Sequence, residues 1–249
     1  MIKDQKETGG SEYAGERIAK RIAGAGVCSR REAETLIAEG RVKVNGKKIT
    51  SAALNVSEKD AVVVDGKLLQ PRSETRLWLY HKPAGLVTTH KDEQGRKTVF
   101  EALPKTLPRV ISIGRLDLNS EGLLLLTNDG SLARKLELPA TGWIRRYRVR
   151  AYGGITPSML EGMKKGVTID GINYGSIEAT LDSQKGDNSW ITVSLREGKN
   201  REIRRIFEHY GCTVSRLLRL SYGPFQLGSL AKGEVKEVTG KVLKSFVGN

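Results

Sequence analysis

Short apolar segments of strand length recur from residue 77 onward, and this recurrence constrains the fold more than any other feature. Gly and Asn turns separate many of them, which favours antiparallel pairing of neighbouring strands. The predicted strands are Leu77–Tyr80, Val110–Ile113, Leu123–Thr127, Arg146–Ala151, Val167–Ile169, Ser176–Asp182 and Ser189–Leu195. The predicted helices are Leu132–Leu136, Pro157–Lys165 and Asn200–Tyr210. The pattern therefore predicts an α+β fold with a mostly antiparallel sheet, flanked by helices and loops.

The segment before residue 77 has a different pattern, typical of a small separate α/β unit. A helical pattern begins at Glu16 and is broken at Gly26, and Ser29 with Glu32 has the spacing of a capping box for a second helix that ends at Gly40. Strands are predicted at Val42–Val44 and Ala61–Val64, followed by tight Asn45-Gly46 and Asp65-Gly66 turns. We therefore expect a disordered lead-in at 1–15, a small domain at 16–70, a linker at 71–76 and a larger domain at 77–249.

The charge of the chain indicates a polyanionic partner. Lys and Arg number 42 against 28 Asp and Glu, which gives a formal net charge of +14. Such an excess attracts nucleic acid, although a generic basic protein is the alternative. We expect no membrane association, because there is no long basic amphipathic stretch and no apolar run of membrane-spanning length. The charged start MIKDQKETGG lacks a secretory signal pattern, so we expect a cytoplasmic protein. Histidines and cysteines are too few and too scattered for a zinc site, and we expect no metal.

Basic residues are dense in the small first domain. Two of them, Arg30 and Arg31, lie at a predicted helix start, where backbone N–H groups also favour phosphate. Such a surface suits structured RNA, which is recognised largely by shape and backbone contacts. The alternative is a solvated charged face. The candidate RNA-binding residues here are Arg17, Lys20, Arg30, Arg31, Arg41 and Lys43.

A polar segment between two predicted strands carries the candidate catalytic group, Asp117. The preceding strand ends at Gly114, and Arg115, Asp117 and Glu121 follow before the apolar strand from Leu123. A carboxylate on a short loop between core strands is held rigidly, as a catalytic carboxylate must be. The alternative is that Asp117 caps a turn or pairs with Arg115.

Two further segments supply partners for such a carboxylate. In the predicted helix at 200–210, Arg201, Arg204 and Arg205 are spaced to share a face, and one of them can ionise a carboxylate while others bind RNA phosphate. Tyr147 lies among arginines on a predicted strand, a pattern that suits base stacking beside phosphate contacts. A basic surface helix and an ordinary half-buried strand tyrosine are the alternatives.

The motifs together resemble known families. The run RIAKRIAGAGVCSRREAETLIAEGRVKVNGKKI resembles the S-four-type RNA-binding domain. LYHKPAGLVTT, GRLDLNSEGLLLLTNDG, RRYRV and LREGKNREIRRIFEHYGCTVSRLLRLSYGP resemble, in order, the ribosomal RNA pseudouridine synthases of the RsuA/RluB type. The resemblance implies that Asp117 is the catalytic aspartate, Tyr147 packs on the target base, Arg204 is the partner of Asp117, and Leu217 is a core leucine near the site. Arg145 and Ser120 stand where Lys and Thr are usual, and neither departure touches this chemistry.

The resemblance further implies a cofactor-free isomerisation of a flipped-out uridine to pseudouridine. Asn200-Arg201-Glu202 is closer to the members that act on large-subunit (23S) rRNA. The expected partner is therefore ribosomal RNA, bound by a monomer, with Arg115, Arg201 and Arg205 supporting the site or the RNA. Asp117 would act either as a nucleophile on the sugar or as the base that removes its 2′ proton. The rival interpretation is a non-catalytic RNA-binding ribosome-assembly factor.

Overall fold

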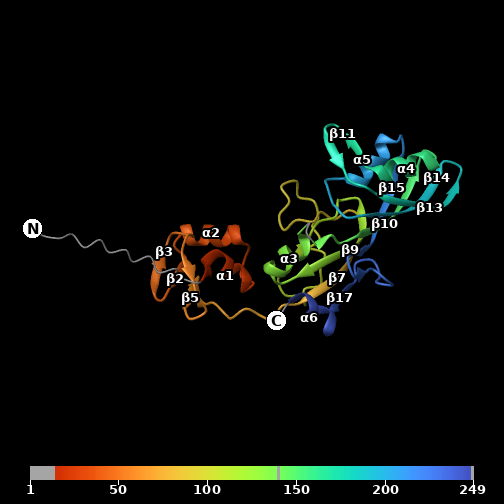
Figure 1. The fold of residues 1–249 in the computed structure, drawn as a ribbon. Coiled ribbons are helices and arrows are strands. Elements are labelled where there is room, and N and C mark those ends of the chain that lie inside the picture. Colours follow the sequence, from red (N-terminus) through yellow and green to blue (C-terminus); the bar gives the residue numbers. More distant parts are fainter. Residues whose placement is uncertain (1–14, 139–140, 248–249) are drawn as a thin grey trace, which may run out of the picture. The chain divides into compact units, whose positions relative to one another are not determined.

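A computed structural model describes residues 15–138 and 141–247 of the chain (Figure 1). It divides into a front unit that ends at Glu74 and a larger unit that begins at Thr75. The lead-in expected at 1–15 lies, apart from Gly15, outside the described residues.

The front unit combines two helices with a small antiparallel sheet of strand order β3-β2-β5-β6. Its elements are β1 (Glu16–Arg17), α1 (Ile18–Gly24), α2 (Arg30–Ala38), β2 (Val42–Val44), β3 (Lys47–Ile49), β4 (Asn55–Val56), β5 (Val62–Val64) and β6 (Lys67–Leu68). Its core joins helix residues such as Ile22 and Ile37 to strand valines such as Val42 and Val62. Each of the two helices buries one apolar face against the sheet, which is how so short a segment forms a core of its own.

The capping box and the Asn45-Gly46 turn predicted for the front unit are present, whereas the start of the first helix differs from the prediction. The Ser29 hydroxyl accepts from the Glu32 N–H at 3.2 Å, and the Glu32 carboxylate accepts from the Ser29 N–H at 2.7 Å, so the capping box is confirmed. Asn45-Gly46 joins β2 to β3, and both residues have positive φ, as a tight hairpin turn requires. The first helix begins at Ile18 instead of Glu16, because Glu16 and Arg17 pair with β4 as a short strand.

The larger unit is built on one sheet with the strand order β13-β14-β10-β15-β9-β7-β17, with β16 beside β15 and β8 beside β9. Neighbours along it are antiparallel except β15 and β9, which are parallel. The strands are β7 (Leu77–Lys82), β8 (Ile111–Ile113), β9 (Ser120–Thr127), β10 (Arg145–Tyr152), β11 (Val167–Ile169), β12 (Ile172–Tyr174), β13 (Glu178–Lys185), β14 (Asn188–Leu195), β15 (Thr213–Tyr222), β16 (Phe225–Gln226) and β17 (Val235–Val238). The helices are α3 (Gly130–Glu137), α4 (Pro157–Lys165), α5 (Glu202–His209) and α6 (Lys241–Val247). The expected α+β fold with a mostly antiparallel sheet is confirmed.

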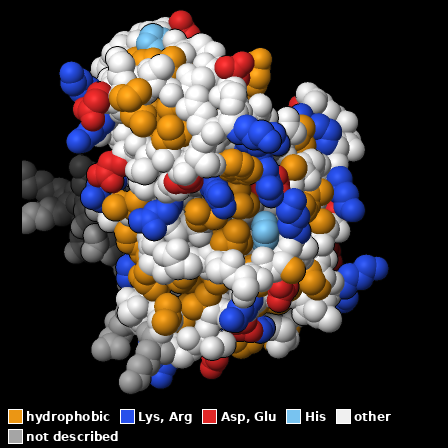
Figure 2. Space-filling model, turned by 90° about the vertical axis from the view of Figure 1, so that its right-hand side faces the viewer, with side chains coloured by type: hydrophobic (Ala, Val, Ile, Leu, Met, Phe, Trp, Pro, Cys, Tyr) orange, Lys and Arg blue, Asp and Glu red, His pale blue; other side chains and the backbone are white. Residues whose placement is uncertain are grey.

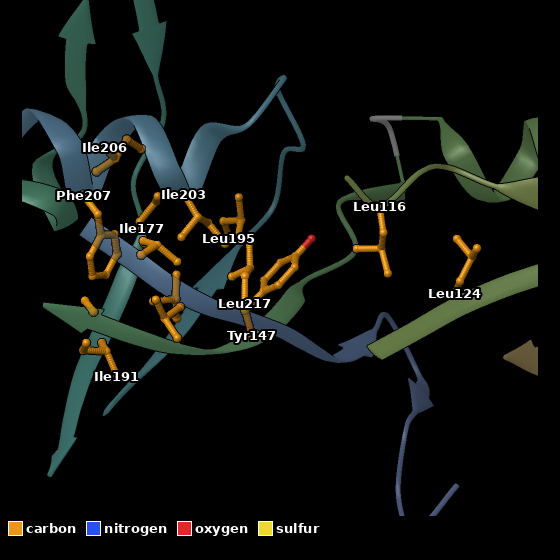
Figure 3. Packing of buried hydrophobic residues seen from close by; sticks show 14 of the residues in the cluster. Leu116, Leu124, Tyr147, Ile177, Ile191, Leu195, Ile203, Ile206, Phe207 and Leu217 are labelled. Atoms are coloured by element: carbon orange, nitrogen blue, oxygen red, sulfur yellow. The ribbon is translucent and has the colours of Figure 1, made fainter. Parts of the chain in front are cut away.

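Strand β9 lies between two cores because both of its faces are covered. Leu124 and Leu126 belong to the core that includes α5 and β10, whereas Leu123 and Leu125 belong to the core that includes α3 and β16. Alternate side chains of a strand point to opposite faces, so consecutive leucines here serve both layers. Figure 3 shows the first of these cores, in which Ile203, Ile206 and Phe207 of α5 pack over the sheet. The loop before β9 is therefore attached to the most buried strand of the unit.

Candidate active site

Asp117 lies in the loop that joins β8 to β9. Gly114 ends β8 with a φ of +68°, a left-handed conformation that favours glycine, and the Ser120 N–H donates to the Asp117 carbonyl at 3.0 Å where β9 begins. Arg115 is exposed in this loop, whereas Asp117 is half-buried. The strand begins at Ser120, three residues earlier than the sequence indicated, so the charged Glu121 lies within it and is buried.

A buried cation, Lys82, holds the backbone of this loop. Its ammonium group is fully buried at the end of β7 and donates to the carbonyl oxygens of Asp117 at 3.1 Å and Ser120 at 2.9 Å. It also donates to Pro83 O at 3.0 Å and reaches Leu118 O at 3.4 Å. Burial lowers the pKa of Lys82 to about 8, and the negative charges of Asp117 and Glu121 oppose that shift. Lys82 was not among the predicted site residues, although a lysine inside an apolar strand was a signal that could have found it.

Two residues that follow Lys82 fix the loop on either side of Asp117. The Thr88 hydroxyl donates to the Leu116 carbonyl at 2.8 Å and accepts from the Leu116 N–H at 3.4 Å. The Gly85 N–H donates to the Leu118 carbonyl at 2.8 Å. The residues immediately before and after Asp117 are therefore both tied to the segment after β7, and sequence reasoning missed both contacts.

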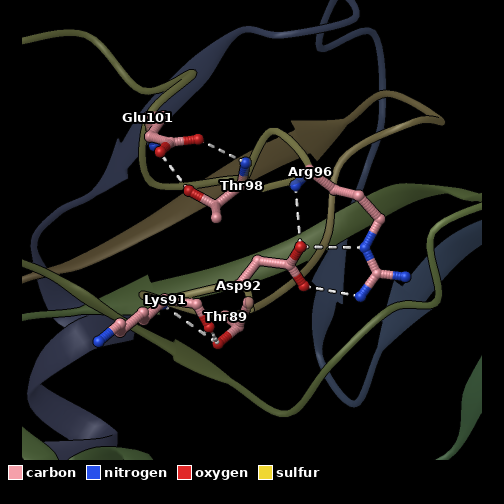
Figure 4. A network of polar contacts seen from close by, with 6 residues as sticks. All are labelled: Thr89, Lys91, Asp92, Arg96, Thr98 and Glu101. Atoms are coloured by element: carbon pink, nitrogen blue, oxygen red, sulfur yellow. Dashed lines mark hydrogen bonds and ion pairs between the residues drawn. The ribbon is translucent and has the colours of Figure 1, made fainter. Parts of the chain in front are cut away.

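The segment that carries Thr88 is itself braced by side chains (Figure 4). Arg96 donates to the Asp92 carboxylate from its side chain at 2.6 Å and from its backbone N–H at 2.8 Å, and these hydrogen bonds lower the pKa of Asp92 to about 2. Thr98 and Glu101 exchange hydrogen bonds in a reciprocal turn, with the Thr98 N–H donating at 2.7 Å. These hydrogen bonds brace part of the long connection between β7 and β8.

Arg204 approaches the loop from α5. Its side chain is only 7% exposed, and its guanidinium donates to Val214 O at 2.8 Å and to Asn119 O at 3.0 Å. Burial lowers the pKa of Arg204, Arg201 adds to the effect, and the charge of Asp117 opposes it. Arg204 thus interacts with the Asp117 charge, while its hydrogen bonds go to backbone carbonyls. Arg204 contacts the backbone two residues after Asp117, and its role as the partner of Asp117 stays a prediction.

Tyr147 and Leu217 lie on neighbouring strands beside the loop. Tyr147 on β10 is 8% exposed, and Figure 3 shows its ring extending toward Leu116. Leu217 on β15 is opposite Val149 of β10 and is in register with Ser120 of β9. Parallel pairing of β15 with β9 therefore places the predicted core leucine next to the loop that carries Asp117.

The other predicted arginines of this region do not share one face. Arg201 is exposed and lies before the helix in a left-handed conformation (φ +50°). We expected Arg201 within the helix, but α5 begins only at Glu202. Arg205 is half-buried and its guanidinium donates to the Tyr174 hydroxyl at 3.4 Å. Because Arg204 points into the core, only Arg201 and Arg115 are open to solvent among the arginines proposed near the site.

The basic residues of the front unit differ in how free they are. Arg30 and Arg31 are exposed as the first two residues of α2, and Lys43 is exposed on β2. Arg41 is bound at 2.7 Å by Asp65 and at 3.0 Å by Glu39, and both hydrogen bonds raise its pKa. Lys20 lies 3.5 Å from Glu16, and Arg17 donates to the Ala53 carbonyl. Of the six candidate RNA-binding residues in the front unit, Arg30, Arg31 and Lys43 are therefore the most available to bind RNA.

None of the helices in the described ranges has both the length and the apolar character needed to cross a membrane. Over residues 15–138 and 141–247, no three His, Cys, Asp or Glu side chains are grouped so that they could hold a metal ion.

The chain is similar to proteins of one kind. Residues 76–209 match the family model described as RNA pseudouridylate synthase, and residues 16–71 match the S4 domain. An uncharacterized RNA pseudouridine synthase of Rickettsia bellii is 56% identical over 229 residues, covering 92% of this chain and 99% of that protein. The ribosomal large subunit pseudouridine synthase B of Pseudomonas aeruginosa is 42% identical over 231 residues, covering 90% of this chain and 60% of that protein. A solved structure, the crystal structure of a pseudouridylate synthase, superposes with a TM-score of 0.65 at 25% identity and covers 90% of this chain and 96% of its own.

The matched family spans the segment that contains Lys82, Asp117, Tyr147 and Arg204, and the S4 match covers the basic front unit. The chain therefore belongs to the RNA pseudouridylate synthase family and carries an S4 domain before its synthase domain.

Proposed function

We propose that this enzyme converts a uridine of large-subunit ribosomal RNA to pseudouridine and that Asp117 initiates the reaction. The large-subunit assignment rests on relatives named ribosomal large subunit pseudouridine synthase B, at 42% identity in Pseudomonas aeruginosa and 43% in Haemophilus influenzae. The chain spans 60% and 61% of the lengths of these two proteins. The observation that carries the catalytic assignment is the rigid placement of Asp117 by Lys82, Thr88 and Arg204.

Two buried cations, Lys82 and Arg204, lie near the Asp117 loop. Burial lowers the pKa of both Lys82 and Arg204, and the negative charge of Asp117 opposes this lowering in both, so the two cations interact electrostatically with the carboxylate. Their hydrogen bonds go to backbone carbonyl oxygens, so the side-chain oxygens of Asp117 are left for the substrate. A carboxylate with these neighbours is held in place through its backbone.

The reaction keeps the atoms of uridine and changes one bond. The bond from the sugar C1′ to N1 of the base breaks, the base turns, and a bond from C1′ to C5 forms while the proton on C5 is lost and N1 gains one. The target base must leave its stack to reach a pocket, where Tyr147 packs on it. Asp117 acts at the sugar, either by adding to C1′ or by removing the 2′ proton so that a glycal forms.

The Asp117→Asn variant tests the catalytic assignment, because it keeps the shape of the side chain and removes the charge. We expect it to bind an unmodified 23S rRNA transcript as the wild type does and to form no pseudouridine in a single-turnover assay. The matched control is Asp170→Asn, which removes the same charge from an exposed turn. Wild-type product formation by Asp117→Asn would refute the assignment.

The choice of RNA is tested in cells. Mapping pseudouridines in both ribosomal RNAs from cells with and without the protein should show loss at a large-subunit position only. A loss confined to the small-subunit RNA would overturn the large-subunit assignment and leave the chemistry intact.

The front unit is proposed to deliver the synthase domain to its RNA. Deleting residues 1–70 should weaken binding to the transcript and lessen its dependence on salt, because phosphate contacts by residues such as Arg30, Arg31 and Lys43 are lost. Unchanged affinity across a salt series would contradict this role. The monomeric state and the cytoplasmic location expected from the sequence stay predictions.

A further inference from the structure

Three arginines form a row on the sheet face opposite Tyr147. Arg146, Arg148 and Arg150 of β10 are exposed, while Tyr147 and Val149 between them are buried in the core beneath α5. Alternate residues of a strand point to one face and lie roughly 6.6 Å apart along it. The row therefore presents three guanidinium groups on the side of the sheet that does not contain Asp117.

This part of the sheet face has no helix packed on it in the described structure. The helices α4 and α5 pack on the other face, through Met163, Ile203 and Phe207. The core that covers the arginine side is built from α3, β16 and the leucines of β9, and it includes no residue of β10 or β14. The arginines are consequently on an open surface and not at the rim of a core.

An aromatic ring accompanies the arginines. Trp190 of β14 is opposite Arg150 in the sheet and is partly exposed, and the Arg148 guanidinium lies 4.9 Å from the centre of its ring. Figure 2, which shows the side of the molecule that lies to the right in Figure 1, shows Lys and Arg side chains spread over this whole side among hydrophobic ones. Aromatic rings and arginines on an open sheet are a common platform for the bases and phosphates of single-stranded RNA.

Nearby carboxylates neutralise this row only in part. Asp182 comes no closer than 4.0 Å to the Arg148 guanidinium and accepts a hydrogen bond from the Thr192 hydroxyl at 3.0 Å. Arg150 donates to the neutral amide of Asn188 at 3.4 Å. Arg148 and Arg150 therefore make only weak contacts within the protein, and their guanidinium groups can bind an anion that approaches this face.

We propose that Arg146, Arg148, Arg150 and Trp190 form a second RNA-binding surface, the arginine face, which binds an unpaired stretch of the substrate RNA away from the target uridine. The proposal rests on the proposed function for the identity of the RNA. Because β13 is the edge strand beyond β14, RNA that occupies the active-site side must pass around the sheet edge to reach the arginine face. The arginine face thus serves long substrates, and it contributes to binding without taking part in the chemistry.

The test compares two triple variants of the full chain. The first replaces Arg146, Arg148 and Arg150 by Gln. The matched control replaces the exposed Lys164, Lys165 and Lys244 by Gln, which removes the same charge elsewhere in the larger unit. A full-length 23S rRNA transcript is bound to each across a KCl series. We plot the logarithm of the binding constant against the logarithm of the salt concentration. For the arginine variant we expect the slope of this plot to be smaller in magnitude by about 2, since each phosphate contact to a single strand contributes about 0.7 to the slope. The control should keep the wild-type slope.

A second pair of variants separates stacking from charge. Trp190→Ala should weaken binding by about tenfold through the loss of one base stack, while Trp190→Phe should keep most of the affinity. In turnover assays the arginine variant should raise KM and leave kcat unchanged, as expected for binding that is equal in the ground and transition states. Thermal unfolding of every variant is measured alongside to confirm that the fold is kept.

The proposal is overturned if the arginine variant and the lysine control have the same salt slope. It is also overturned if the arginine variant lowers kcat at saturating RNA without a change in affinity, because the effect would then lie in the active site. Unchanged RNA binding with loss of modification only in cells would indicate a protein partner at this face and reject RNA. If the wild type forms no pseudouridine on the transcript, the proposed function is wrong. The comparison of salt slopes then still shows whether the arginine face binds RNA.

Discussion

The ammonium group of Lys82 donates a hydrogen bond to the main-chain carbonyl of Asp117, at 3.1 Å, from a site with no solvent exposure. A buried charge is costly unless its hydrogen bonds are satisfied, and Lys82 satisfies them with carbonyl groups of the loop itself. The cation therefore acts on the backbone that carries the carboxylate, and its charge lies close enough to be influenced by that carboxylate. Lys82 thus fixes the position of Asp117 and is itself influenced by the Asp117 charge.

Replacing Lys82 by Met should lower kcat by about a hundredfold and leave KM for RNA nearly unchanged. The carbonyls of Asp117 and Ser120 lose their donor, and a misplacement of about 1 Å at a reacting group costs about that factor. RNA cannot touch the buried Lys82, so binding should not suffer. Lys105→Met, at an exposed position, is the control. A variant whose loss lies wholly in KM would contradict the positioning role.

The activity should also fall as pH rises through about 8, where Lys82 loses its proton. Burial lowers the pKa of Lys82 in the folded protein below its value of 10.5 in the unfolded chain. Between these two values the unfolded state binds the extra proton, so the contribution of Lys82 to stability rises with pH in that window. The decline in kcat is therefore not caused by unfolding at Lys82. Measurements of kcat and of unfolding free energy from pH 6.5 to 9.5 check this, and a flat kcat would refute it.

Thr88→Val should reduce both stability and kcat, whereas Thr88→Ser should behave nearly as the wild type. Val has the shape of Thr without its hydroxyl, so Leu116 loses its hydrogen-bond partner in a buried setting. An unsatisfied buried carbonyl costs about 1–3 kcal/mol. Urea denaturation gives the stability, and single-turnover rates give the effect on Asp117. Equal behaviour of the two variants would show that the hydroxyl has no part in holding the loop.

Arg204→Lys should lose most activity although it keeps the positive charge. One guanidinium reaches both Val214 O and Asn119 O, and the single ammonium of Lys cannot reproduce that fork. The control is Arg205→Lys, whose guanidinium contacts the Tyr174 hydroxyl and not the loop. Rates are compared at a temperature where circular dichroism shows each variant to be folded. Full activity of Arg204→Lys would mean that charge alone is required of Arg204.

Local patterns were sufficient where the deciding contacts are close in sequence. The capping box of Ser29 and Glu32 and the helix at Pro157–Lys165 formed as predicted, since each depends on residues within a few positions. The placement of Asp117 between two strands was also evident, because the apolar segments on both sides of the loop are visible in the sequence. The S4 and synthase motifs then indicated the family.

Contacts between distant segments were not accessible in this way. Strand β15 was missed although it is central in the sheet, because it includes Arg216 and Arg219 and its pairing with β10 is interrupted by register shifts. Arg219 is buried there because its side chain donates to Leu123 O at 2.7 Å and lies over the Tyr222 ring. Lys82 was missed for the same reason, and the backbone contacts of Arg204 were not foreseen, since a charged side chain is buried only when distant carbonyl groups meet it.

The last prediction concerns Glu202, the first residue of α5, which burial keeps protonated. Burial raises its pKa to about 8, and the nearby carboxylate of Glu197 adds to the effect. The Lys199 N–H donates to Glu202 at 2.8 Å, and the Gly175 N–H donates to Glu197 at 2.6 Å, so both carboxyl groups are fixed beside the loop that precedes α5. The unfolded chain has the ordinary pKa of 4.5, so as pH rises from there to about 8 the unfolded state releases a proton that the folded state retains. Stability must therefore fall with pH in that window.

Glu202→Gln should remove this dependence, because the amide keeps an oxygen for the Lys199 N–H and offers a donor to Glu197 without ionising. The variant should match the wild type in unfolding free energy near pH 5 and exceed it at pH 8.5. Glu208→Gln, at an exposed position on the same helix, is the control and should show no such crossover. Urea denaturation at the two pH values provides the measurement. A variant that is destabilised equally at both would mean that Glu202 is ionised in the folded protein, and α5 would then have a negative charge two residues from Arg204.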